Sequence, residues 1–249
     1  MPTGRTDTLL AMTGMLSLVG GDELNPGNEP QDEALIRAAR PGPAYVLATA
    51  AARGRPDLAA ANAVRWFAGL GIEMEELPVR TRSDASSKET AAKAEAGGLF
   101  YLVGGDPGLV VDVLESSRVW NAIADAWRNG AALAGSSAGA MAFGEWSLIR
   151  GGRWPKHDER RYKPALGVVP GVAVIPHHDT FGAGWRTPAG LSKPEDAVLL
   201  GLDERTAAVW RDGVWTALGA GTVNVEASDP EPRVFRAGER IEGLPEPAG

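Results

Sequence analysis

The stretch AALAGSSAGAMAF at residues 131–143 decides the fold. Its apolar run, 131–134, leads into a Gly-x-Ser-x-Gly pattern at 135–139, and the residues that follow it can open a helix. A strand, a sharp turn and a helix in this order lift the serine oxygen above the edge of a sheet. Ser137 is therefore a candidate nucleophile. The pattern by itself also fits a tight glycine-rich turn with solvated serines.

Apolar runs of strand length recur on either side of this stretch. Helical patterns lie between them, over 56–70, 87–96 and 109–128. This alternation predicts an α/β fold with a doubly wound, mostly parallel sheet and helices on both of its faces. The runs that we expect as strands are each bounded by Gly or Pro and cover 15–19, 44–50, 72–79, 99–103, 131–134 and 172–175.

The character of the chain changes after residue 200. Residues 207–210 and 214–218 flank Asp212-Gly213, and an Asp-Gly pair supplies the positive φ angles of a two-residue turn. We therefore expect an antiparallel edge hairpin near the C-terminus, with 222–226 as a further strand. The length of 249 residues and the even apolar content predict a single domain over 1–249, with loosely ordered tails at 1–13 and 240–249.

Composition excludes several classes of protein. The 25 basic and 32 acidic residues form no long run of one sign, which disfavours a nucleic-acid partner. The absence of cysteine excludes disulfides, thiolate zinc sites and cysteine nucleophiles. Residues 9–19 are apolar but broken by Thr13 and Gly14, and no run is long enough to span a membrane. A cytoplasmic location is the default expectation. The oligomeric state is left open, a homo-oligomer included.

A serine nucleophile needs a base, and the chain offers His157, His177 and His178. His157 lies in a charged stretch typical of an exposed loop. His177 and His178 follow an apolar strand at its carboxyl end, where open α/β sheets bind their ligands. Because adjacent residues leave a strand on opposite sides, we expect one of this pair to face Ser137.

The base in turn needs a carboxylate that fixes its tautomer. Asp179 is near in sequence, whereas Asp203 and Glu204 end the apolar run 197–202, and spacing does not choose among them. The order of residues disfavours one fold. The α/β-hydrolases place their histidine last, whereas here no histidine follows position 178.

Four segments together resemble peptidase family S51, the serine peptidases that include dipeptidase E and cyanophycinase. The resemblance covers roughly residues 14–225 and implies a flavodoxin-like sheet similar to that of class I glutamine amidotransferases, with serine in place of their cysteine. The segments that carry it are FYLVGGD at 100–106, GSSAGA at 135–140, PHHD at 176–179 and GLDERTA at 201–207.

The resemblance also implies roles for single residues. His178 stands where the family has phenylalanine, so His177 is preferred as the base. The implied reaction is acyl transfer through a covalent intermediate, without metal or cofactor. The positions that match the family's motifs are Ser137 as nucleophile, His177 as base, Glu204 as its carboxylate, and Gly105 and Ala138 as the amide donors of an oxyanion hole.

The substrate is expected to be a small peptide. Cyanophycinases resemble one another in closely spaced arginines after the histidine, which suit an aspartyl polymer, but here 181–185 intervenes before Arg186. Dipeptides of the Asp-X or β-aspartyl type are favoured instead. Asp106 and Arg186, and less so Arg153, are candidates for substrate contact, because arginine holds a carboxylate in bidentate fashion.

Two other readings of the sequence compete with a hydrolase. A non-catalytic binding or regulatory module of amidotransferase-like shape stays open. Nucleotide binding through 104–108 is disfavoured, because the spacing of its glycines matches neither the P-loop nor the Gly-x-Gly-x-x-Gly pattern.

Overall fold

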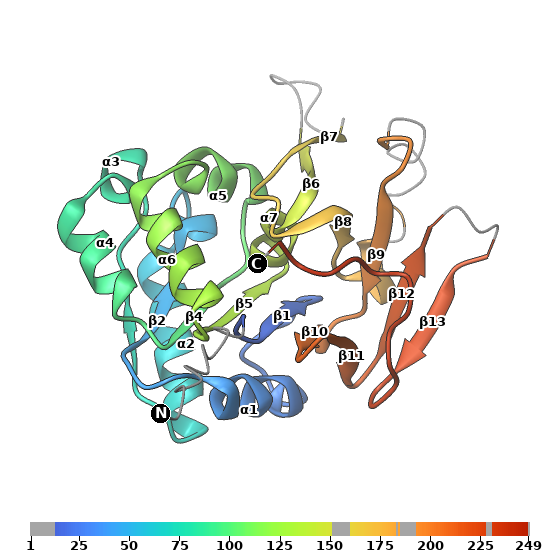
Figure 1. Cartoon of the computed structure of the whole chain (residues 1–249), viewed down its shortest axis with the longest axis horizontal. Helices are drawn as coiled ribbons and strands as arrows, with labels where there is room; N and C mark the ends of the chain where they lie inside the picture. The colour runs from blue at the N-terminus through green and yellow to red at the C-terminus, as the bar shows by residue number, and fades with distance from the viewer. Residues whose placement is uncertain (1–12, 151–159, 183, 185–192, 228–230, 249) are drawn as a thin grey trace, which may run out of the picture.

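The computed structural model describes residues 13–150, 160–182, 184, 193–227 and 231–248. Its main sheet has the strand order β11-β10-β1-β5-β4-β2-β3 (Figure 1). The strands from β1 to β3 in this order pair in parallel, and β10 and β11 add an antiparallel hairpin at the edge. The bounds are β1 (Leu16–Val19), β2 (Ala44–Leu47), β3 (Met74–Glu76), β4 (Leu99–Leu102), β5 (Ala132–Ser136), β10 (Thr206–Arg211) and β11 (Val214–Gly219).

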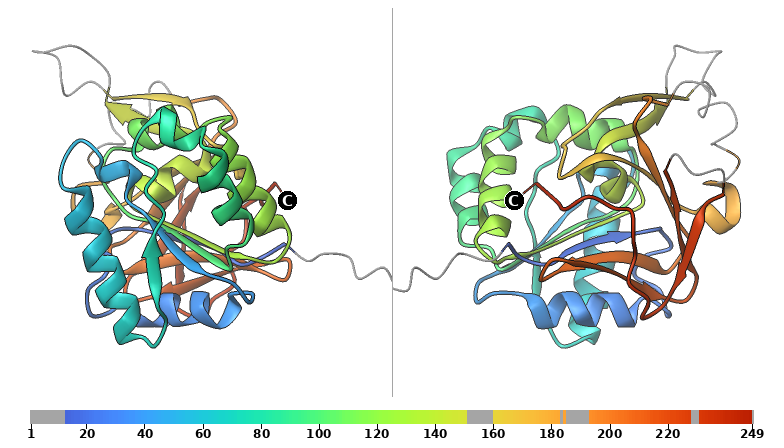
Figure 2. Two further views of the ribbon diagram at one scale, coloured as in Figure 1. Left: turned by 90° about the vertical axis from the view of Figure 1, so that its left-hand side faces the viewer. Right: turned by 45° about the vertical axis from the view of Figure 1, so that its right-hand side comes forward.

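Helices cover both faces of the main sheet (Figure 2). One face packs on α1 (Glu29–Ala38) and α2 (Pro56–Gly69), with Val19 and Tyr101 of the strands against Leu35 and Phe67 of the helices. The opposite face packs on α4 (Lys88–Glu95), α5 (Pro107–Leu114), α6 (Arg118–Arg128) and α7 (Ala138–Phe143). Neighbouring strand residues point to opposite faces, so each strand serves both cores. The expected doubly wound α/β fold and its edge hairpin are confirmed.

A second sheet lies beside the main one, and the sequence did not separate the two. Its strand order is β13-β12-β9-β8-β6-β7, and the expected strand at 172–175 belongs here rather than to the main sheet. Apolar side chains of both sheets share one core. A buried strand therefore has the same apolar sequence pattern whichever sheet it belongs to. The bounds are β6 (Gly144–Arg150), β7 (Arg160–Pro164), β8 (Val169–Ile175), β9 (Val198–Leu202), β12 (Thr222–Glu226) and β13 (Arg233–Arg236).

The helix expected over 109–128 is in fact two helices, α5 and α6. Ser116 between them has a left-handed φ of 51°, and the hydroxyl of Ser117 accepts a hydrogen bond from the amide of Trp120 at 3.1 Å. The serine cap begins a new helix there. The spacing of apolar residues continues across the break, so the sequence pattern did not show it. The sequence analysis also missed α1, β6, β7 and β13, and the short segments η1 (Thr49–Ala51), α3 (Arg82–Ala85) and η2 (His178–Gly182).

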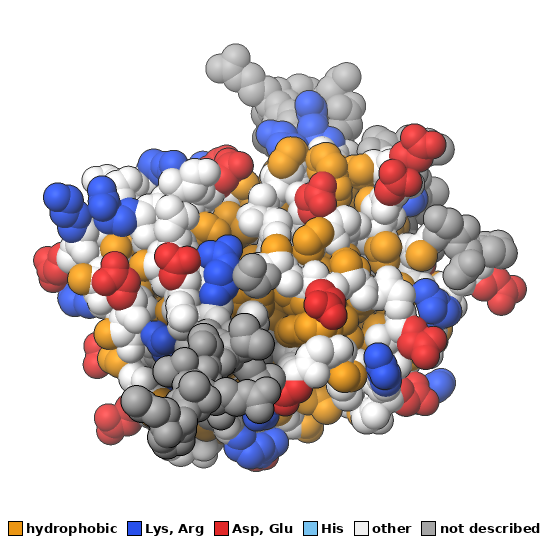
Figure 3. All heavy atoms as spheres, viewed as in Figure 1, with side chains coloured by type: hydrophobic (Ala, Val, Ile, Leu, Met, Phe, Trp, Pro, Cys, Tyr) orange, Lys and Arg blue, Asp and Glu red, His pale blue; other side chains and the backbone are white. Residues whose placement is uncertain are grey.

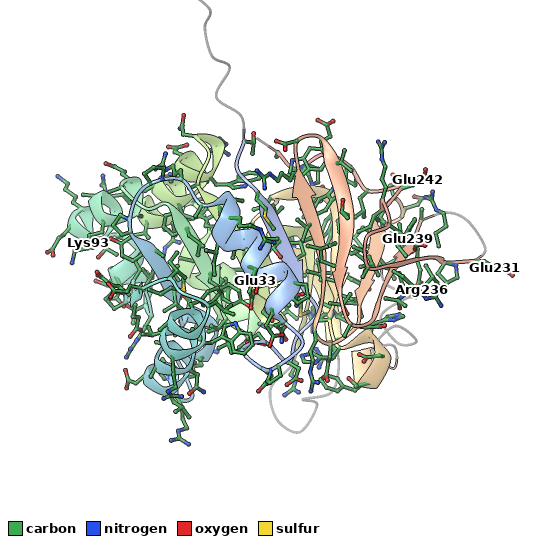
Figure 4. The ribbon with its side chains drawn as sticks, turned by 90° about the horizontal axis from the view of Figure 1, so that it is seen from below. Glu33, Lys93, Glu231, Arg236, Glu239 and Glu242 are labelled. Atoms are coloured by element: carbon green, nitrogen blue, oxygen red, sulfur yellow. The ribbon has the colours of Figure 1, made fainter. Side chains whose placement is uncertain are left out.

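The C-terminal tail was expected to be loose over 240–249, but its residues up to 248 pack on the body of the molecule. Ile241 is buried, the indole of Trp215 donates to the carbonyl of Pro245 at 2.8 Å, and the amide of Ala248 donates to Val168. The side chains of Glu239 and Glu242 in this region point outward (Figure 4). The sequence of this tail is rich in polar residues, Pro and Gly, but its backbone forms hydrogen bonds with the body of the molecule.

Charged groups of both signs are mixed over the face seen in Figure 3. Among the described residues, no helix has the length and apolar character to cross a membrane. The described residues also hold no group of three or more His, Cys, Asp or Glu side chains that could bind a metal ion.

Candidate active site

Ser137 stands in a strained turn between β5 and α7. Its φ is 48° and its ψ is −109°, a conformation that costs free energy for any residue with a side chain. Backbone hydrogen bonds hold it: the amide of Ser137 donates to Val19 of β1 at 2.9 Å, and its carbonyl accepts from Met141 at 2.9 Å. A Cβ at Gly135 would lie 2.6 Å from the carbonyl carbon of Gly139. Gly135 is thus needed for the turn to close, and Gly139 for its packing on β4, because a Cβ at Gly139 would lie 2.5 Å from the carbonyl oxygen of Leu102.

His177 follows β8 and is held on every side. Its amide donates to the carbonyl of Gly20 at 2.7 Å, and its carbonyl accepts from Gly182 at 2.7 Å. One face of the ring lies so close to Gly21 that a Cβ there would come within 2.3 Å of it. The Phe181 ring stacks on His177 with centroids 4.6 Å apart. The imidazole therefore has little freedom to turn.

Ser137, His177 and Glu204 form one chain of hydrogen bonds. Ser137 Oγ lies 3.0 Å from His177 Nε2, and His177 Nδ1 lies 2.7 Å from Glu204 Oε1. A carboxylate accepts the proton on Nδ1, and this leaves Nε2 as the acceptor that faces the serine. Asp179 is not part of this chain, because its carboxylate accepts the backbone amide of Glu204 at 3.0 Å.

His178 leaves the strand end on the other side. Its ring packs on Gly201 of β9, where a Cβ would lie 2.6 Å from it, and its Nδ1 lies 3.6 Å from Asp203 Oδ1. The other oxygen of Asp203 accepts the amide and the hydroxyl of Thr222, each at 2.7 Å. His178 and Asp203 thus belong to the packing of the second sheet, while His177 faces Ser137.

The turn after β4 brings a second backbone segment against Ser137. A Cβ at Gly104 would lie 3.3 Å from that of Ser137, and one at Gly105 would lie 2.3 Å from the carbonyl oxygen of Ala50. Gly105 has a φ of 146°, and its amide and that of Ala138, the first residue of α7, come from the two segments that meet at the serine. Amides placed in this way can stabilise an oxyanion.

A cavity of about 730 Å³ opens beside these groups, with Gly105, Ser137, His177 and Phe181 in its wall. Asp106 also lines it, but one of its carboxylate oxygens caps α5 by accepting the amides of Gly108 at 2.9 Å and Leu109 at 3.3 Å. The wall carries charges of both signs: Arg53, Arg150, Arg160 and Lys163 are basic, and Asp106, Asp112 and Glu115 are acidic. His157, Arg153 and Arg186 lie outside the described residues.

Sequence reasoning missed the part played by the loop after β1. Four successive residues, 20–23, each contact a different part of the site. Gly20 accepts from His177, Gly21 lies under its ring, and Asp22 Oδ2 accepts from Arg205 Nε at 2.5 Å, beside Glu204. Glu23 reaches the turns that carry Gly105 and Ser137. The sequence signal for this loop was a Gly-rich turn at the end of a strand, and such a turn does not indicate which residues the loop will contact.

A model of peptidase family S51 matches residues 33–217. The chain belongs to this family. Family membership confirms the resemblance inferred from the four sequence segments.

The S51 assignment agrees with individual relatives. A peptidase from an acI-B1 Actinobacterium has a solved structure that is 31% identical, with a TM-score of 0.81, and the match covers 93% of this chain and 98% of that one. The cyanophycinase of Trichormus variabilis is 31% identical over 187 residues, which are 73% of this chain and 63% of that enzyme. A putative peptidase E protein from Listeria monocytogenes EGD-e shares the fold at 15% identity and a TM-score of 0.56, over 87% of this chain and 99% of that one. This S51 chain thus spans less than two thirds of the cyanophycinase that it matches.

Proposed function

We propose that this protein is a serine hydrolase that cleaves a peptide or amide bond in a small peptide. One observation carries the proposal: the unbroken chain of hydrogen bonds from Ser137 through His177 to Glu204, with the first two in a cavity wall. These residues come from separate strand ends, and packing alone gives no reason for them to converge. Membership of a peptidase family and the solved peptidase of similar fold support the same reading.

The geometry supports a mechanism of acyl transfer. Ser137 Oγ attacks the carbonyl carbon of the scissile bond while His177 Nε2 takes its proton, and Glu204 stabilises the imidazolium that forms. The amides of Gly105 and Ala138 donate to the negative oxygen of the tetrahedral intermediate. The intermediate expels the amine, which takes the proton back from His177. A water, deprotonated by the same nitrogen, then attacks the ester, releases the acid and restores the serine.

The proposed substrate is a short peptide with an acidic group next to the scissile bond, of the Asp-X or β-aspartyl type. Basic side chains in the cavity wall, among them Arg150 and Lys163, support binding of a carboxylate. Acidic side chains in the same wall, among them Asp112 and Glu115, can receive the free amino group of a dipeptide. A cavity of about 730 Å³ suits a ligand of that size.

Labelling with a fluorophosphonate tests the activated serine. We expect the folded wild-type protein to be labelled and Ser137→Ala to remain unlabelled, because the probe reacts with a serine that an adjacent base deprotonates. Ser83→Ala removes an exposed serine of α3 and serves as the control for specificity, because it leaves Ser137 and its partners intact. Absence of labelling on folded wild-type protein would contradict the hydrolase and favour the non-catalytic module.

A matched panel of dipeptides tests the substrate class. We compare Asp-Leu and β-Asp-Leu with Asn-Leu, which differs by one charge. The acidic members should be cleaved faster, because a carboxylate that pairs with a basic wall keeps the reacting carbonyl in place. Equal kcat/KM for Asp-Leu and Asn-Leu would reject an acidic substrate and leave the hydrolase itself intact.

A further inference from the structure

The carboxylate of Glu23 joins two turns of the site that are far apart in the chain. Its Oε1 accepts the backbone amide of Gly104 at 2.7 Å, 81 positions away. Its Oε2 accepts the hydroxyl of Ser136 at 2.9 Å, 113 positions away. Gly104 and Ser136 immediately precede Gly105 and Ser137. One side chain therefore bridges the turn of the expected oxyanion donor and the turn of the serine.

Gly104 and Gly105 have no side chains with which to fix their own backbone. Gly104 is held from outside by Glu23, and on the far side of Gly105 the amide of Asp106 donates to the carbonyl of Ala50 at 2.9 Å. The Gly105 amide thus lies between two amides that are each tied down. Its direction depends on both ties, because a glycine backbone adopts many conformations when it is released.

Glu23 is itself part of a well-bonded loop. Asp22 and Leu24 on either side of it have left-handed φ angles of 51° and 62°. The side-chain amide of Asn28, which is buried, donates to the carbonyls of Asp22 at 2.8 Å and Asn25 at 3.0 Å. Side-chain bonds of this kind let a non-glycine loop persist in a strained shape. The shape turns Glu23 toward the main sheet.

We propose that Glu23 is a positioning residue, which holds the Gly105 amide and Ser137 at a fixed separation during acyl transfer. The inference rests on the proposed hydrolase function and assigns Glu23 no contact with the substrate. An oxyanion donor acts at about 2.7 to 3.1 Å from the developing charge, and a misplacement of about 1 Å can cost about 100-fold in rate. Because the oxyanion exists only after attack, loss of the bridge lowers kcat more than it changes KM.

Two substitutions at Glu23 separate geometry from charge. In Glu23→Gln, the carbonyl oxygen still accepts from Gly104 and the amide group donates to the Ser136 hydroxyl, which can rotate. In Glu23→Ala both bonds are lost. We expect kcat to fall by about 100-fold in Glu23→Ala with KM changed less than about threefold, and kcat of Glu23→Gln to stay within about threefold of wild type. A wild-type rate in Glu23→Ala, or an equal loss in both variants, would overturn the proposal.

Glu29→Ala is the matched control, at the first residue of α1, where the loop ends. Glu29 also accepts a backbone amide, that of Gly27 at 2.6 Å, but contacts neither turn of the site. We expect its kcat to equal that of wild type. A loss as large as that of Glu23→Ala would show that the loop as a whole, rather than the bridge, controls the rate.

Ser136→Ala keeps the test decisive if Glu23→Ala melts near room temperature. It removes the bond to Oε2 and leaves that of the Gly104 amide to Oε1. We expect a loss of about tenfold that adds little in the double variant, since coupled residues are not additive. A wild-type rate in Ser136→Ala would contradict the bridge. The two proposals fail differently: unlabelled wild type rejects the hydrolase, while labelled wild type with an unaffected Glu23→Ala rejects only the positioning role.

Discussion

The two sheets contribute different halves of the candidate site. The main sheet carries Ser137 after β5 and Gly105 after β4, both in turns whose backbone is strained or of positive φ. The second sheet carries His177 after β8, and Glu204 lies where the chain passes from β9 of that sheet to β10 of the main one. The attacking group and its base thus belong to different sheets, and their alignment depends on how the sheets pack.

The loop after β1 is where the two halves meet. It ties the second sheet through Gly20 and Gly21 at His177, and it ties the main sheet through Glu23 at Gly104 and Ser136. The comparison therefore teaches that a serine on a rigid elbow is only half of such a site. The following variants disturb one half, the connection, or the side of the molecule away from the junction.

The largest effect is expected at the strand end of the second sheet. His177→Ala should lower kcat by about 10⁴- to 10⁶-fold, because the serine loses its base. His178→Ala, whose ring packs on Gly201, should stay within about tenfold. Steady-state hydrolysis and the rate of fluorophosphonate labelling measure both. A larger loss of kcat in His178→Ala than in His177→Ala would show that the base lies on the opposite side of β8.

The next largest effect is expected at Glu204, where the chain passes from the second sheet to the main one. Glu204→Gln should lower kcat by about 10⁴-fold, because an amide can hold the wrong tautomer of His177. Asp179→Asn removes the charge but keeps a carbonyl oxygen that can still accept the backbone amide of Glu204, so it should cost less than about tenfold. Comparable losses in the two variants would show that the carboxylate acts by shaping the loop rather than through the imidazole.

The connection itself is tested with Gly21→Ala. The added methyl group would lie 2.3 Å from the His177 ring, so the ring must move and the rate should fall by about 10- to 100-fold. Gly213→Ala is the matched control, because Gly213 also has a positive φ, of 81°, but a Cβ there meets nothing within 4 Å. Thermal denaturation checks that both variants fold. Equal rates in the two variants would contradict a role for the contact between Gly21 and the His177 ring.

The smallest effect on activity is expected on the face of the main sheet away from the second sheet. The pKa of Asp32 is raised to about 7, mainly by burial; the hydrogen bond from Trp66 lowers it in part, and the nearby carboxylates of Glu23 and Glu29 add to the rise. The folded state thus binds a proton more tightly than the unfolded chain, and the free energy of unfolding should fall as the pH rises from about 4 to about 7.

Asp32→Asn should remove this pH dependence. The amide oxygen can still accept from the Trp66 indole, which lies 2.8 Å from Asp32 Oδ2, and no charge forms. We expect the variant to melt several degrees above wild type at pH 8 and at about the same temperature at pH 4. Calorimetry at both values measures the difference. The same difference in melting temperature at both pH values would contradict the assignment of this pH dependence to the Asp32 carboxyl.

The sequence by itself determined the elements whose cause is local. The Gly-x-Ser-x-Gly pattern at 135–139 predicted the elbow, in which a Cβ at Gly135 would meet the backbone of Gly139, four residues further on. The alternation of strands and helices predicted the main sheet, and the Asp-Gly turn predicted its edge hairpin. The period of a strand also predicted that His177 and His178 leave on opposite sides, which the structure confirms. Each of these follows from neighbours within a few residues.

Only the tertiary structure decided which groups contact one another. Asp179, Asp203 and Glu204 are alike in sequence terms, and the packing of the second sheet on the main one brings Glu204 alone of the three to the His177 ring. That second sheet was not separable in the sequence, because a buried apolar strand carries no mark of the sheet it joins. The hydrogen-bond partners of Glu23, Gly104 and Ser136, lie 81 and 113 positions away in the sequence. No local sequence pattern predicts a hydrogen bond over such a separation.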